Sequence, residues 1–345
     1  MILVLNCGSQ SIKWKVFSEK LKALKEGKRE ILNTADFEKD LEKEIEKIIV
    51  ALRSKNLKIS IIGHRVVHGK NIFREPTEIT EENLKELDAL NYLSPLHNPF
   101  NVLGIKICQK ILIGVPQFAV FDTEFFKDLP EVAYTYALPK KIIKEFGFRR
   151  YGFHGISYEY AARKAAEKIK KPFEKLKIIT CHLGGGASIT AIKNGKAIDT
   201  SMGYSPTEGV IMMTRSGDID NEIILKMSEI YGVEKASDII NKESGLLAIC
   251  GEKEMLAVLD KNKNGDKKSK LALEIFVYQI KKYIGAYYAI LGGCDILVFT
   301  GAVGFGSVKI RNMICKDLNI LKKTKVRAIE TNEELAIALK ILNLK

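Results

Sequence analysis

The sequence predicts an α/β protein made of two similar domains, each of which mixes strands and helices. Its 345 residues favour two domains over one. Short apolar runs of strand length alternate with helical patterns, as in mixed α/β folds. Two strands pass through a glycine-rich turn straight into further apolar residues, as a β-hairpin does. One such hairpin spans 1–17 and the other starts at 178, so the sequence indicates a duplicated fold.

Three strands of the chain run into turns made of glycine and small polar residues. These turns are 6–11, 182–188 and 300–307. Glycine lets the backbone approach an anion closely, and successive N–H groups can form a concave anion site. We therefore expect a polyphosphate to bind between the two halves of the molecule.

The remaining elements follow from apolar spacing and from turn residues. Asn98 is expected to cap a helix that has Pro99 in its first turn. Thr331 is expected to form a capping box with Glu334, and Asp260–Ser269 to be a charged surface loop. The predicted helices are 37–54, 81–90, 139–146, 157–170, 219–231, 267–290 and 307–318, and the predicted strands are 59–67, 115–121, 188–193, 196–200, 296–299 and 325–329.

The charge of the chain is strongly positive, with a formal net charge of +13 and a pI near 9.2. Its lysines are scattered, many of them among acidic residues, and no recognition motif of a nucleic-acid-binding module is visible. We therefore expect solvated helix faces and an anionic small substrate, with no nucleic-acid or membrane partner. No apolar run is long enough for a membrane span, no signal peptide is visible, and none of the six cysteines forms a C-x-x-C pair. These features predict a cytoplasmic protein.

Three of the five histidines have ordinary structural interpretations. His64 and His68 would share one face of a strand, but no acidic residue completes a helical zinc motif, so zinc is not expected. His97 lies in a proline-bounded turn, where a buried, hydrogen-bonded imidazole is the simplest interpretation.

Four charged or titratable residues lie where an α/β enzyme places its chemistry. Asp122 ends an apolar strand, and His154 lies between two glycines and beside two arginines. Arg215 follows an apolar stretch in a polar turn, where its guanidinium fork would match phosphate oxygens. Glu333 is not the reciprocal partner in the expected capping box, so it could hold a magnesium-bound water. A cap or a surface charge is the alternative for each, but together these residues suggest phosphoryl transfer, which needs positioning and charge neutralisation.

Several of these stretches resemble the acetate kinase family, which belongs to the hexokinase–actin superfamily and has a duplicated ribonuclease H-like fold. The similarity extends from residue 3 to about residue 340, and several of its motifs are long. It implies an N-terminal ribonuclease H-like domain, 1–126, completed by 332–345, and a C-terminal ribonuclease H-like domain, 127–331, for nucleotide binding and dimerisation, with a cleft between them. The similar stretches are Asn6–Lys13, Gly63–Gly69, Pro95–Pro99, Phe121–Thr123, Arg149–Gly155, His182–Gly186, Asp199–Gly203, Thr214–Asp220 and Thr331–Glu334.

The resemblance implies an acetate kinase reaction. The γ-phosphoryl group of ATP would pass directly and in line to acetate, reversibly and with magnesium, giving acetyl phosphate and ADP. An ionised carboxylate is already a nucleophile at neutral pH, so no general base is required. The family also implies a homodimer that forms through the second domain.

Position by position, the resemblance assigns three groups of residues outside the nucleotide site. The catalytic residues, which would orient partner groups or stabilise charge on the transferring phosphoryl group, are Asp122, His154 and Arg215. The substrate-binding residues, which would hold the carboxylate, contact phosphate or line a small pocket for the acyl methyl group, are Arg65, Val67, Leu96, His97, Phe153 and Pro206. The magnesium-site positions are Asn6 and Glu333.

A fourth group would bind ATP, and the chain departs from the family pattern within it. Gly185 replaces the usual asparagine of the phosphate loop, and Leu256 stands where an arginine contacts adenosine in the family. The adenosine loop also differs, and Tyr158 replaces a histidine. The ATP-binding positions are Ser9, Ser11, Lys13, His182, Leu183, Gly184, Gly185, Gly186, Glu254, Met255, Leu256, Ala302, Val303, Gly304, Phe305 and Gly306.

The altered nucleotide side leaves two alternatives to an acetate kinase. One is a carboxylate kinase with another donor, such as pyrophosphate or a different nucleotide, or with propionate or butyrate as acceptor. The other is a relative that binds a ligand without turnover. Retention of the catalytic and magnesium positions argues against the second alternative, because a pure binding protein does not need all of them.

Overall fold

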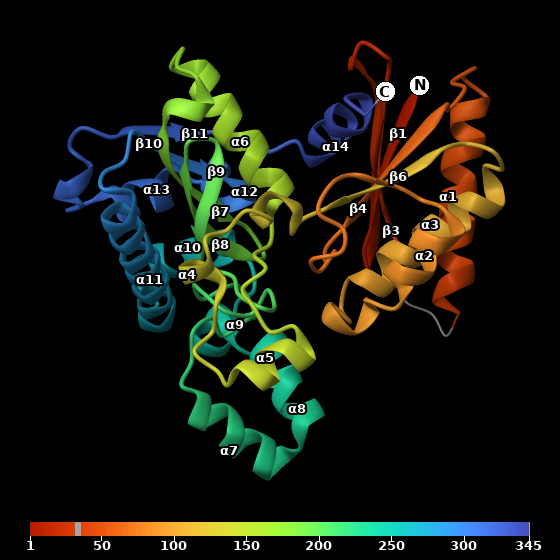
Figure 1. Cartoon of the computed structure of the whole chain (residues 1–345). Coiled ribbons are helices and arrows are strands. Elements are labelled where there is room, and N and C mark those ends of the chain that lie inside the picture. The colour runs from red at the N-terminus through yellow and green to blue at the C-terminus, as the bar shows by residue number, and fades with distance from the viewer. Residues whose placement is uncertain (32–35, 345) are drawn as a thin grey trace. The chain divides into compact units, whose positions relative to one another are not determined.

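The computed structural model describes residues 1–31 and 36–344, which divide into two compact units. Unit 1 comprises 1–127, 153–156 and the C-terminal segment from 332, and unit 2 comprises 128–152 and 157–331. Residue 345, the last of the segment expected to complete the first domain, lies outside the described residues. Each unit is built around one β-sheet, and Figure 1 labels the elements of both.

Unit 1 contains a six-stranded mixed sheet with the order β3-β2-β1-β4-β6-β5. Strands β1, β2 and β3 form an antiparallel meander, and β4 and β6 then run parallel to β1. Helices α1 and α3 lie on one side of this sheet and α14 on the other (Figure 1). The bounds are β1 Ile2–Cys7, β2 Ser11–Phe17, β3 Ala23–Glu30, α1 Phe37–Arg53, β4 Ile61–Val66, β5 Thr77–Glu78, α2 Glu81–Asp88, α3 Asn98–Ile111, β6 Gln117–Phe121 and α14 Glu333–Leu342.

The two faces of this sheet pack differently. On the side of α1, the apolar stripe Leu41, Ile45, Ile48 and Leu52 joins Leu3 and other strand residues in one buried core, as helical spacing predicts. On the other side, α14 approaches β4 at Gly63, where a Cβ atom would lie 2.6 Å from Ile337 Cγ2. A glycine is therefore needed for this close approach of the C-terminal helix.

Unit 2 contains a five-stranded sheet with the order β11-β10-β7-β8-β9 and is rich in helices. The long helix α11 packs against β8 and β7. The bounds are α4 Glu131–Tyr134, α5 Lys140–Phe146, α6 Gly155–Lys168 (its first two residues in unit 1), β7 Lys177–Leu183, β8 Ala187–Lys193, β9 Lys196–Thr200, α7 Asn221–Tyr231, α8 Val233–Asp238, α9 Gly245–Cys250, α10 Met255–Lys263, α11 Lys267–Leu291, β10 Ile296–Thr300, α12 Gly301–Gly306, α13 Val308–Cys315 and β11 Lys325–Ala328.

The two sheets repeat one topology. Strands β9-β8-β7-β10-β11 of unit 2 follow the same order and directions as β3-β2-β1-β4-β6 of unit 1. In each sheet an antiparallel meander comes first, and two strands parallel to its first strand follow. Both predicted hairpins, and the duplicated fold inferred from them, are confirmed.

Two predicted turns of unit 2 are wrong because helices replace them. The third glycine turn is helix α12, which follows β10 directly. Asp260–Ser269 was expected to be a loop, but α10 continues to Lys263 and α11 begins at Lys267. The side chain of Asp266 accepts a hydrogen bond from Ser269 N at 2.7 Å and so caps α11, which begins at the predicted residue 267.

Both predicted helix caps are also wrong, because the side chains bond elsewhere. The cap of α14 is Asn332, which accepts from Leu335 N at 3.0 Å, whereas Thr331 bonds to the hydroxyl of Ser157. Asn98 lies inside α3 rather than capping it, and its amide bonds to the backbone N and O of His68. The predicted place of Pro99 in the first turn is confirmed.

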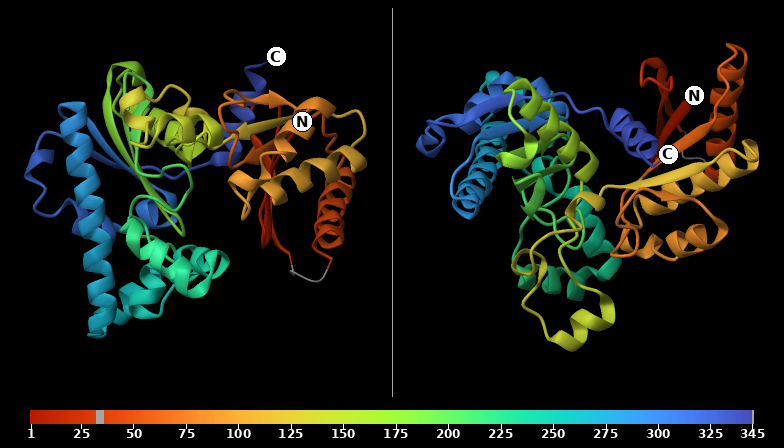
Figure 2. Two further views of the ribbon diagram at one scale, coloured as in Figure 1. Left: turned by 60° about the horizontal axis from the view of Figure 1, so that its bottom comes forward. Right: turned by 45° about the horizontal axis from the view of Figure 1, so that its top comes forward.

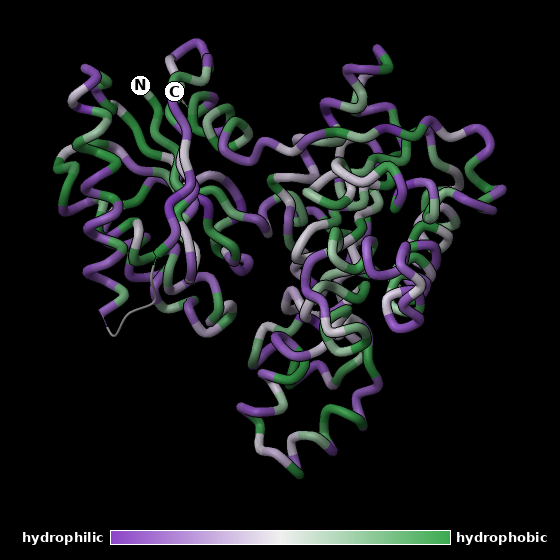
Figure 3. Tube along the Cα trace, turned by 180° about the vertical axis from the view of Figure 1, so that it is seen from behind, coloured by the Kyte–Doolittle hydropathy of each residue, from purple (hydrophilic) through white to green (hydrophobic). Residues whose placement is uncertain are grey.

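Helices α7 and α8 lie at the end of unit 2 away from its sheet (Figures 1 and 2). Every residue of α7 is at least partly exposed, although the helix carries Ile223, Leu225 and Ile230. Hydrophobic and hydrophilic segments alternate along this exposed helix pair at the bottom of Figure 3. Among the described residues, no helix combines the length and the apolar character of a membrane span.

Candidate active site

Three predicted site residues meet at one edge of the first sheet. Asn6 lies near the end of β1, Arg65 near the end of β4, and Asp122 directly after β6. The three strands are neighbours and run parallel, so their carboxyl ends lie at the same edge. Polar residues at this edge form the usual ligand site of α/β sheets.

Arg65, Asp122 and Glu333 form a charged cluster at this edge. Arg65 Nε donates to Asp122 Oδ1 at 3.2 Å, and Arg65 Nη2 donates to Asp122 Oδ2 at 2.6 Å. Glu333 Oε2, from the first turn of α14, lies 3.5 Å from Arg65 Nε. The side chain of Asp122 is only 2% exposed and that of Arg65 18% exposed. The structure therefore brings together a predicted catalytic residue, a predicted substrate residue and a predicted metal position.

Burial and charge act against each other in this cluster. Burial raises the pKa of the Asp122 carboxyl to about 6, although the guanidinium of Arg65 opposes the shift. Burial alone would lower the pKa of Arg65, but the carboxylates of Asp122 and Glu333 outweigh it and raise that pKa above its usual range. At neutral pH Asp122 and Arg65 therefore form an ion pair, and the carboxyl group of Glu333 lies beside it.

The backbone ties His154 to the same cluster. Gly155 N donates to the carbonyl oxygen of Asp122 at 2.9 Å, immediately after His154. A Cβ atom at position 155 would lie 2.3 Å from that oxygen, so only glycine fits. His154 itself has a left-handed backbone with φ +61, which is uncommon outside glycine and occurs often at functional sites.

The predicted acyl-pocket residues of unit 1 differ in exposure. Val67 and Phe153 are buried, whereas Leu96 is 38% exposed. The ring of Phe153 makes an edge contact with His68, with ring centroids 5.4 Å apart. His97, the next residue along, precedes α3 and its side chain does not cap that helix.

An amide that the sequence did not indicate holds this region in place. Asn101 of α3 accepts a hydrogen bond from Val67 N at 3.1 Å and donates to Cys7 O at 2.6 Å. It therefore fixes the ends of β1 and β4 relative to each other. The sequence does contain one local signal. Asn101 is the i+3 neighbour of Asn98, so both amides share one face of the helix, where apolar residues are expected.

The first glycine turn is a compact hairpin. Gly8 N donates to Ser11 O at 2.9 Å, and Asn6 lies opposite Lys13 in the strand register. Ser9 and Ser11 are partly exposed and Lys13 is exposed, so these polar groups are available to a ligand.

The predicted phosphate loop of unit 2, His182–Gly186, begins at the end of β7. Gly184 N donates to Gly186 O at 2.9 Å, and Met213 N donates to Gly185 O at 3.3 Å. His182 is largely buried, and its ring Nδ1 lies 2.8 Å from Ser157 Oγ. The loop is thus closed by its own backbone and held from behind by α6.

A pocket of about 470 Å³ in unit 2 collects three of the predicted nucleotide segments. Its volume is within the range of small-molecule sites. Phe305 is 40% exposed, and its carbonyl accepts a hydrogen bond from Arg311. The predicted ATP-binding positions outside the described lining are Ser9, Ser11, Lys13, His182, Leu183, Gly186, Gly304 and Phe305. The lining residues are Gly184, Gly185, Met213, Lys253, Glu254, Met255, Leu256, Ala302, Val303, Gly306 and Ser307.

Arg215 and Pro206 lie together in unit 2. Arg215 Nη1 donates to Pro206 O at 3.2 Å and lies 3.8 Å from Met212 Sδ. Burial lowers the pKa of Arg215 from its usual value, although a guanidinium remains charged at neutral pH. The buried cation is therefore set in a fixed place beside a predicted substrate residue.

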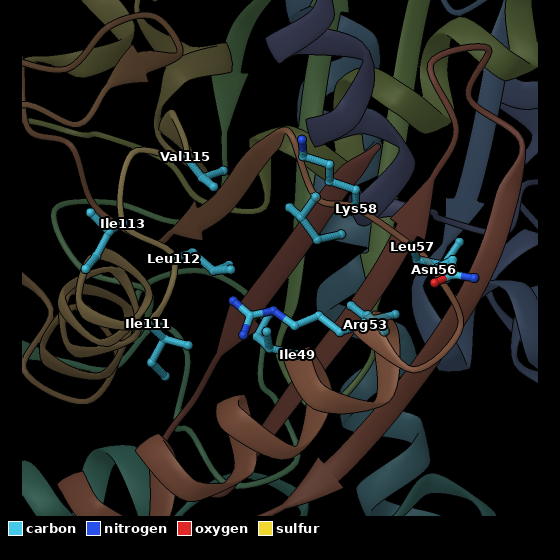
Figure 4. Close-up of a pocket in the computed structure, with 11 residues that line it drawn as sticks. Ile49, Arg53, Asn56, Leu57, Lys58, Ile111, Leu112, Ile113 and Val115 are labelled. Carbon is cyan, nitrogen blue, oxygen red and sulfur yellow. The ribbon is translucent and has the colours of Figure 1, made fainter.

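A second pocket, of about 590 Å³, contains none of the predicted site residues. It lies in unit 1 where α1 and α3 end, and Figure 4 shows Arg53 reaching across it towards Leu112. Cations in the last turn of a helix are favoured by the helix dipole, which accounts for Arg53 without a ligand.

The oxygen donors at the sheet edge fit magnesium rather than a softer metal. The amide of Asn6 and the carboxylate of Glu333 offer oxygen, and magnesium prefers one or two carboxylates with waters and phosphates. The described residues contain no group of three or more His, Cys, Asp or Glu placed to hold a metal by themselves. His64, weighed above as a zinc ligand, is buried and bonds to Gln117 Oε1 at 2.6 Å.

Comparison with known proteins identifies the family. The model of the acetokinase family matches residues 19–334. The chain belongs to the acetokinase family. A protein from Dictyoglomus turgidum named acetate kinase is 43% identical, with 98% of this chain and 96% of the relative covered. One from Carboxydothermus hydrogenoformans, also named acetate kinase, is 42% identical, with 99% and 98% covered.

Solved structures of this family have the same fold. Acetate kinase from Porphyromonas gingivalis matches with a TM-score of 0.90 and 35% identity over 100% of this chain and 99% of that one. A propionate kinase from Francisella tularensis matches with a TM-score of 0.91 and 34% identity over 98% of both chains. The predicted family and the predicted fold class, with two duplicated ribonuclease H-like domains, are therefore confirmed. That the residues of unit 1 and unit 2 face one common cleft remains a prediction.

Proposed function

We propose that this acetokinase-family protein transfers the γ-phosphoryl group of ATP to acetate and forms acetyl phosphate and ADP. The buried two-point contact between Arg65 and Asp122 is the observation that carries the proposal. A partly buried guanidinium held in a fixed orientation is suited to binding a carboxylate. Relatives that are about 40% identical to this chain over nearly their whole length are named acetate kinase, which supports acetate as the acceptor.

Unit 1 supplies the acceptor side in this proposal. Arg65 has five N–H donors, and Asp122 occupies two of them, so donors remain for the acetate carboxylate. Val67 and Phe153 offer apolar surface for the methyl group. Acetate is ionised at neutral pH and attacks the phosphorus atom directly, so no residue has to remove a proton.

Unit 2 supplies the donor side. The phosphate loop offers backbone N–H groups, and Arg215 offers a buried cation to the charge that develops on the transferring phosphoryl group. His154 would add to this stabilisation. Asn6 and Glu333 would hold magnesium, which supplies neutralisation of phosphate charge when it is bound.

The oligomer and the compartment are part of the same proposal. A homodimer through unit 2 is supported by the exposed apolar side chains of α7, where Leu225 is 62% and Ile230 58% exposed. A cytoplasmic location is supported by the cysteines, which are free thiols and mostly buried.

A trapping assay tests the proposed reaction. Purified protein with magnesium and ATP is mixed with acetate, propionate or butyrate, and hydroxylamine converts any acyl phosphate to a hydroxamate. We expect hydroxamate with acetate, and a smaller kcat/KM with butyrate, since each methylene changes discrimination by roughly 1–3 kcal/mol. Folded protein that gives no hydroxamate with any acyl chain or donor would reject the proposal.

The nucleotide pocket favours a second candidate for the donor. Its described lining is mainly glycine and apolar side chains, with Lys253 and Glu254 as its charged members. Base recognition usually needs placed polar groups, so this pocket would distinguish donors weakly. Comparing kcat/KM for ATP, GTP and pyrophosphate separates an ATP-specific enzyme from one that uses several donors.

A further inference from the structure

A buried hydroxyl group lies directly behind the phosphate loop. Ser157, in the first turn of α6, is fully buried, and its Oγ lies 2.8 Å from Nδ1 of His182. The same oxygen donates to Thr331 Oγ1 at 2.8 Å. Ser157 therefore joins the residue that opens the phosphate loop to the residue that precedes the cap of α14.

The direction of the hydrogen bond from Ser157 to Thr331 decides which ring nitrogen of His182 carries the hydrogen. A serine hydroxyl has one proton, and Ser157 gives it to Thr331. Ser157 can then only accept from His182, so Nδ1 of that imidazole carries a hydrogen. The other ring nitrogen, Nε2, is on the loop side, 4.0 Å from where a Cβ atom on Gly184 would lie.

The neighbour of Ser157 restrains the plane of the same ring. Tyr158 makes an edge contact with His182, with ring centroids 6.3 Å apart, and its hydroxyl lies 2.5 Å from Ser188 Oγ. Two consecutive residues of α6 therefore hold the imidazole, one through a hydrogen bond and the other through its ring.

We propose that Ser157 is a positioning residue, which fixes the orientation and the tautomer of His182 so that Nε2 faces the phosphoryl donor. The inference rests on the proposed function, because it takes residues 182–186 as the loop that receives the donor phosphates. In the neutral ring Nε2 has no hydrogen to give, so a proton taken up on Nε2 must accompany the donor phosphates. The resulting imidazolium donates Nε2–H to a phosphate oxygen while Ser157 still accepts Nδ1–H. Removing a residue that orients a ligand in this way typically costs 10- to 100-fold in affinity or activity, as at metal sites.

Nuclear magnetic resonance reads the tautomer directly. Two-bond ¹⁵N–¹H correlations of His182, assigned by loss of its signals in His182→Gln, should show hydrogen on Nδ1 in the neutral ring of the unmodified protein. In Thr331→Val the serine proton loses its acceptor and turns to Nδ1, so the ring hydrogen should move to Nε2. A purely structural role for Ser157 does not predict this exchange.

Kinetics then separates donor binding from acceptor binding. We expect Ser157→Ala to raise the KM for ATP roughly 10-fold or more while the KM for acetate changes less than about twofold. Ser157→Thr, which keeps the hydroxyl, should retain the tautomer and most of the donor affinity. The matched control is Thr200→Val, which removes a buried hydroxyl pair of the same unit, between Thr190 and Thr200, that does not touch His182.

Three results would overturn the proposal. They are hydrogen on Nε2 in the unmodified protein, no change of tautomer in Thr331→Val, and equal rises of both KM values in Ser157→Ala. Failure of the proposed function gives a different pattern, because the tautomer exchange would persist in a protein that forms no acyl phosphate. Thermal unfolding of each variant shows whether it is folded before it is compared.

Discussion

The guanidinium of Arg65 donates two hydrogen bonds, of 2.6 and 3.2 Å, to the carboxylate of Asp122 at the carboxyl edge of the first sheet. The two residues come from neighbouring parallel strands, 57 positions apart in the chain. Glu333 approaches the same guanidinium at 3.5 Å. Asp122 therefore orients the group that we propose binds acetate, and Glu333 contacts the same guanidinium from the first turn of α14.

Replacing Asp122 by Asn should separate orientation from the rest of catalysis. The amide keeps the shape but loses the charge, so Arg65 turns towards Glu333. We expect kcat/KM for acetate to fall about 100-fold or more, measured by hydroxamate formation. Glu75→Gln removes an exposed ion pair with Lys127 in the same unit and should leave kcat/KM unchanged. A loss of less than about threefold in Asp122→Asn would contradict the orienting role.

The pH dependence of activity should report the same carboxyl group. Burial raises the pKa of Asp122 from 3.8 to about 6, so the folded protein binds this proton more tightly than the unfolded chain. Stability from this group is therefore fully present below about pH 4 and is lost as the pH rises through about 6. Activity follows the opposite direction, since the ionised carboxylate is needed, and kcat/KM should fall below about pH 6 with a slope of one. The residual activity of Asp122→Asn should lack this step.

Leu256 should control how well the nucleotide pocket recognises a base. Its side chain is 78% exposed at the pocket where the family pattern has an arginine. Leu256→Arg should lower the KM for ATP and leave the KM for pyrophosphate unchanged, because only ATP carries an adenosine group. Val132→Arg adds the same charge at a residue that is 93% exposed on α4 and should change neither value. Equal effects of the two variants would show that net charge alone is responsible.

Gly155 should not tolerate even a methyl group. In Gly155→Ala the new Cβ would lie 2.3 Å from Asp122 O and 2.8 Å from Phe125 Cβ, so the His154 turn must move. We expect a loss of about 1–3 kcal/mol in the free energy of unfolding and a larger fall in kcat than in donor affinity. Gly285→Ala in α11, where a Cβ would have open space, should instead be neutral or stabilising in chemical denaturation.

The parts of the fold that could be predicted are those with a local cause. The apolar period of 37–54 predicted α1, and the apolar strand that ends at Asp122 predicted a carboxylate at the sheet edge. Strand β3 was not predicted, because Ala23–Glu30 is mostly charged and exposed and lacks alternation of apolar residues. It is a strand because it pairs with β2, so its conformation is set by the neighbouring strand rather than by its own sequence.

The parts of the site that could not be predicted depend on contacts distant in sequence. Asn101 bonds to Cys7 O, 94 positions away, and Ser157 bonds to Thr331, 174 positions away. Neither spacing leaves a pattern in the sequence. A distant contact also explains why the Thr331 capping box is absent. The sequence pattern favours it, but the hydroxyl of Thr331 accepts a hydrogen bond from Ser157, and Asn332 caps α14.

The central claim is that phosphoryl groups pass directly from the donor to a carboxylate held by Arg65, and a labelling experiment tests it most directly. Protein is mixed with magnesium and ATP labelled on its γ-phosphoryl group, with or without acetate, and stopped within one turnover. We predict label in acetyl phosphate, none on the protein, and no labelled product with Arg215→Ala. Labelled protein that passes its label to acetate, or the absence of labelled acetyl phosphate, would contradict the account.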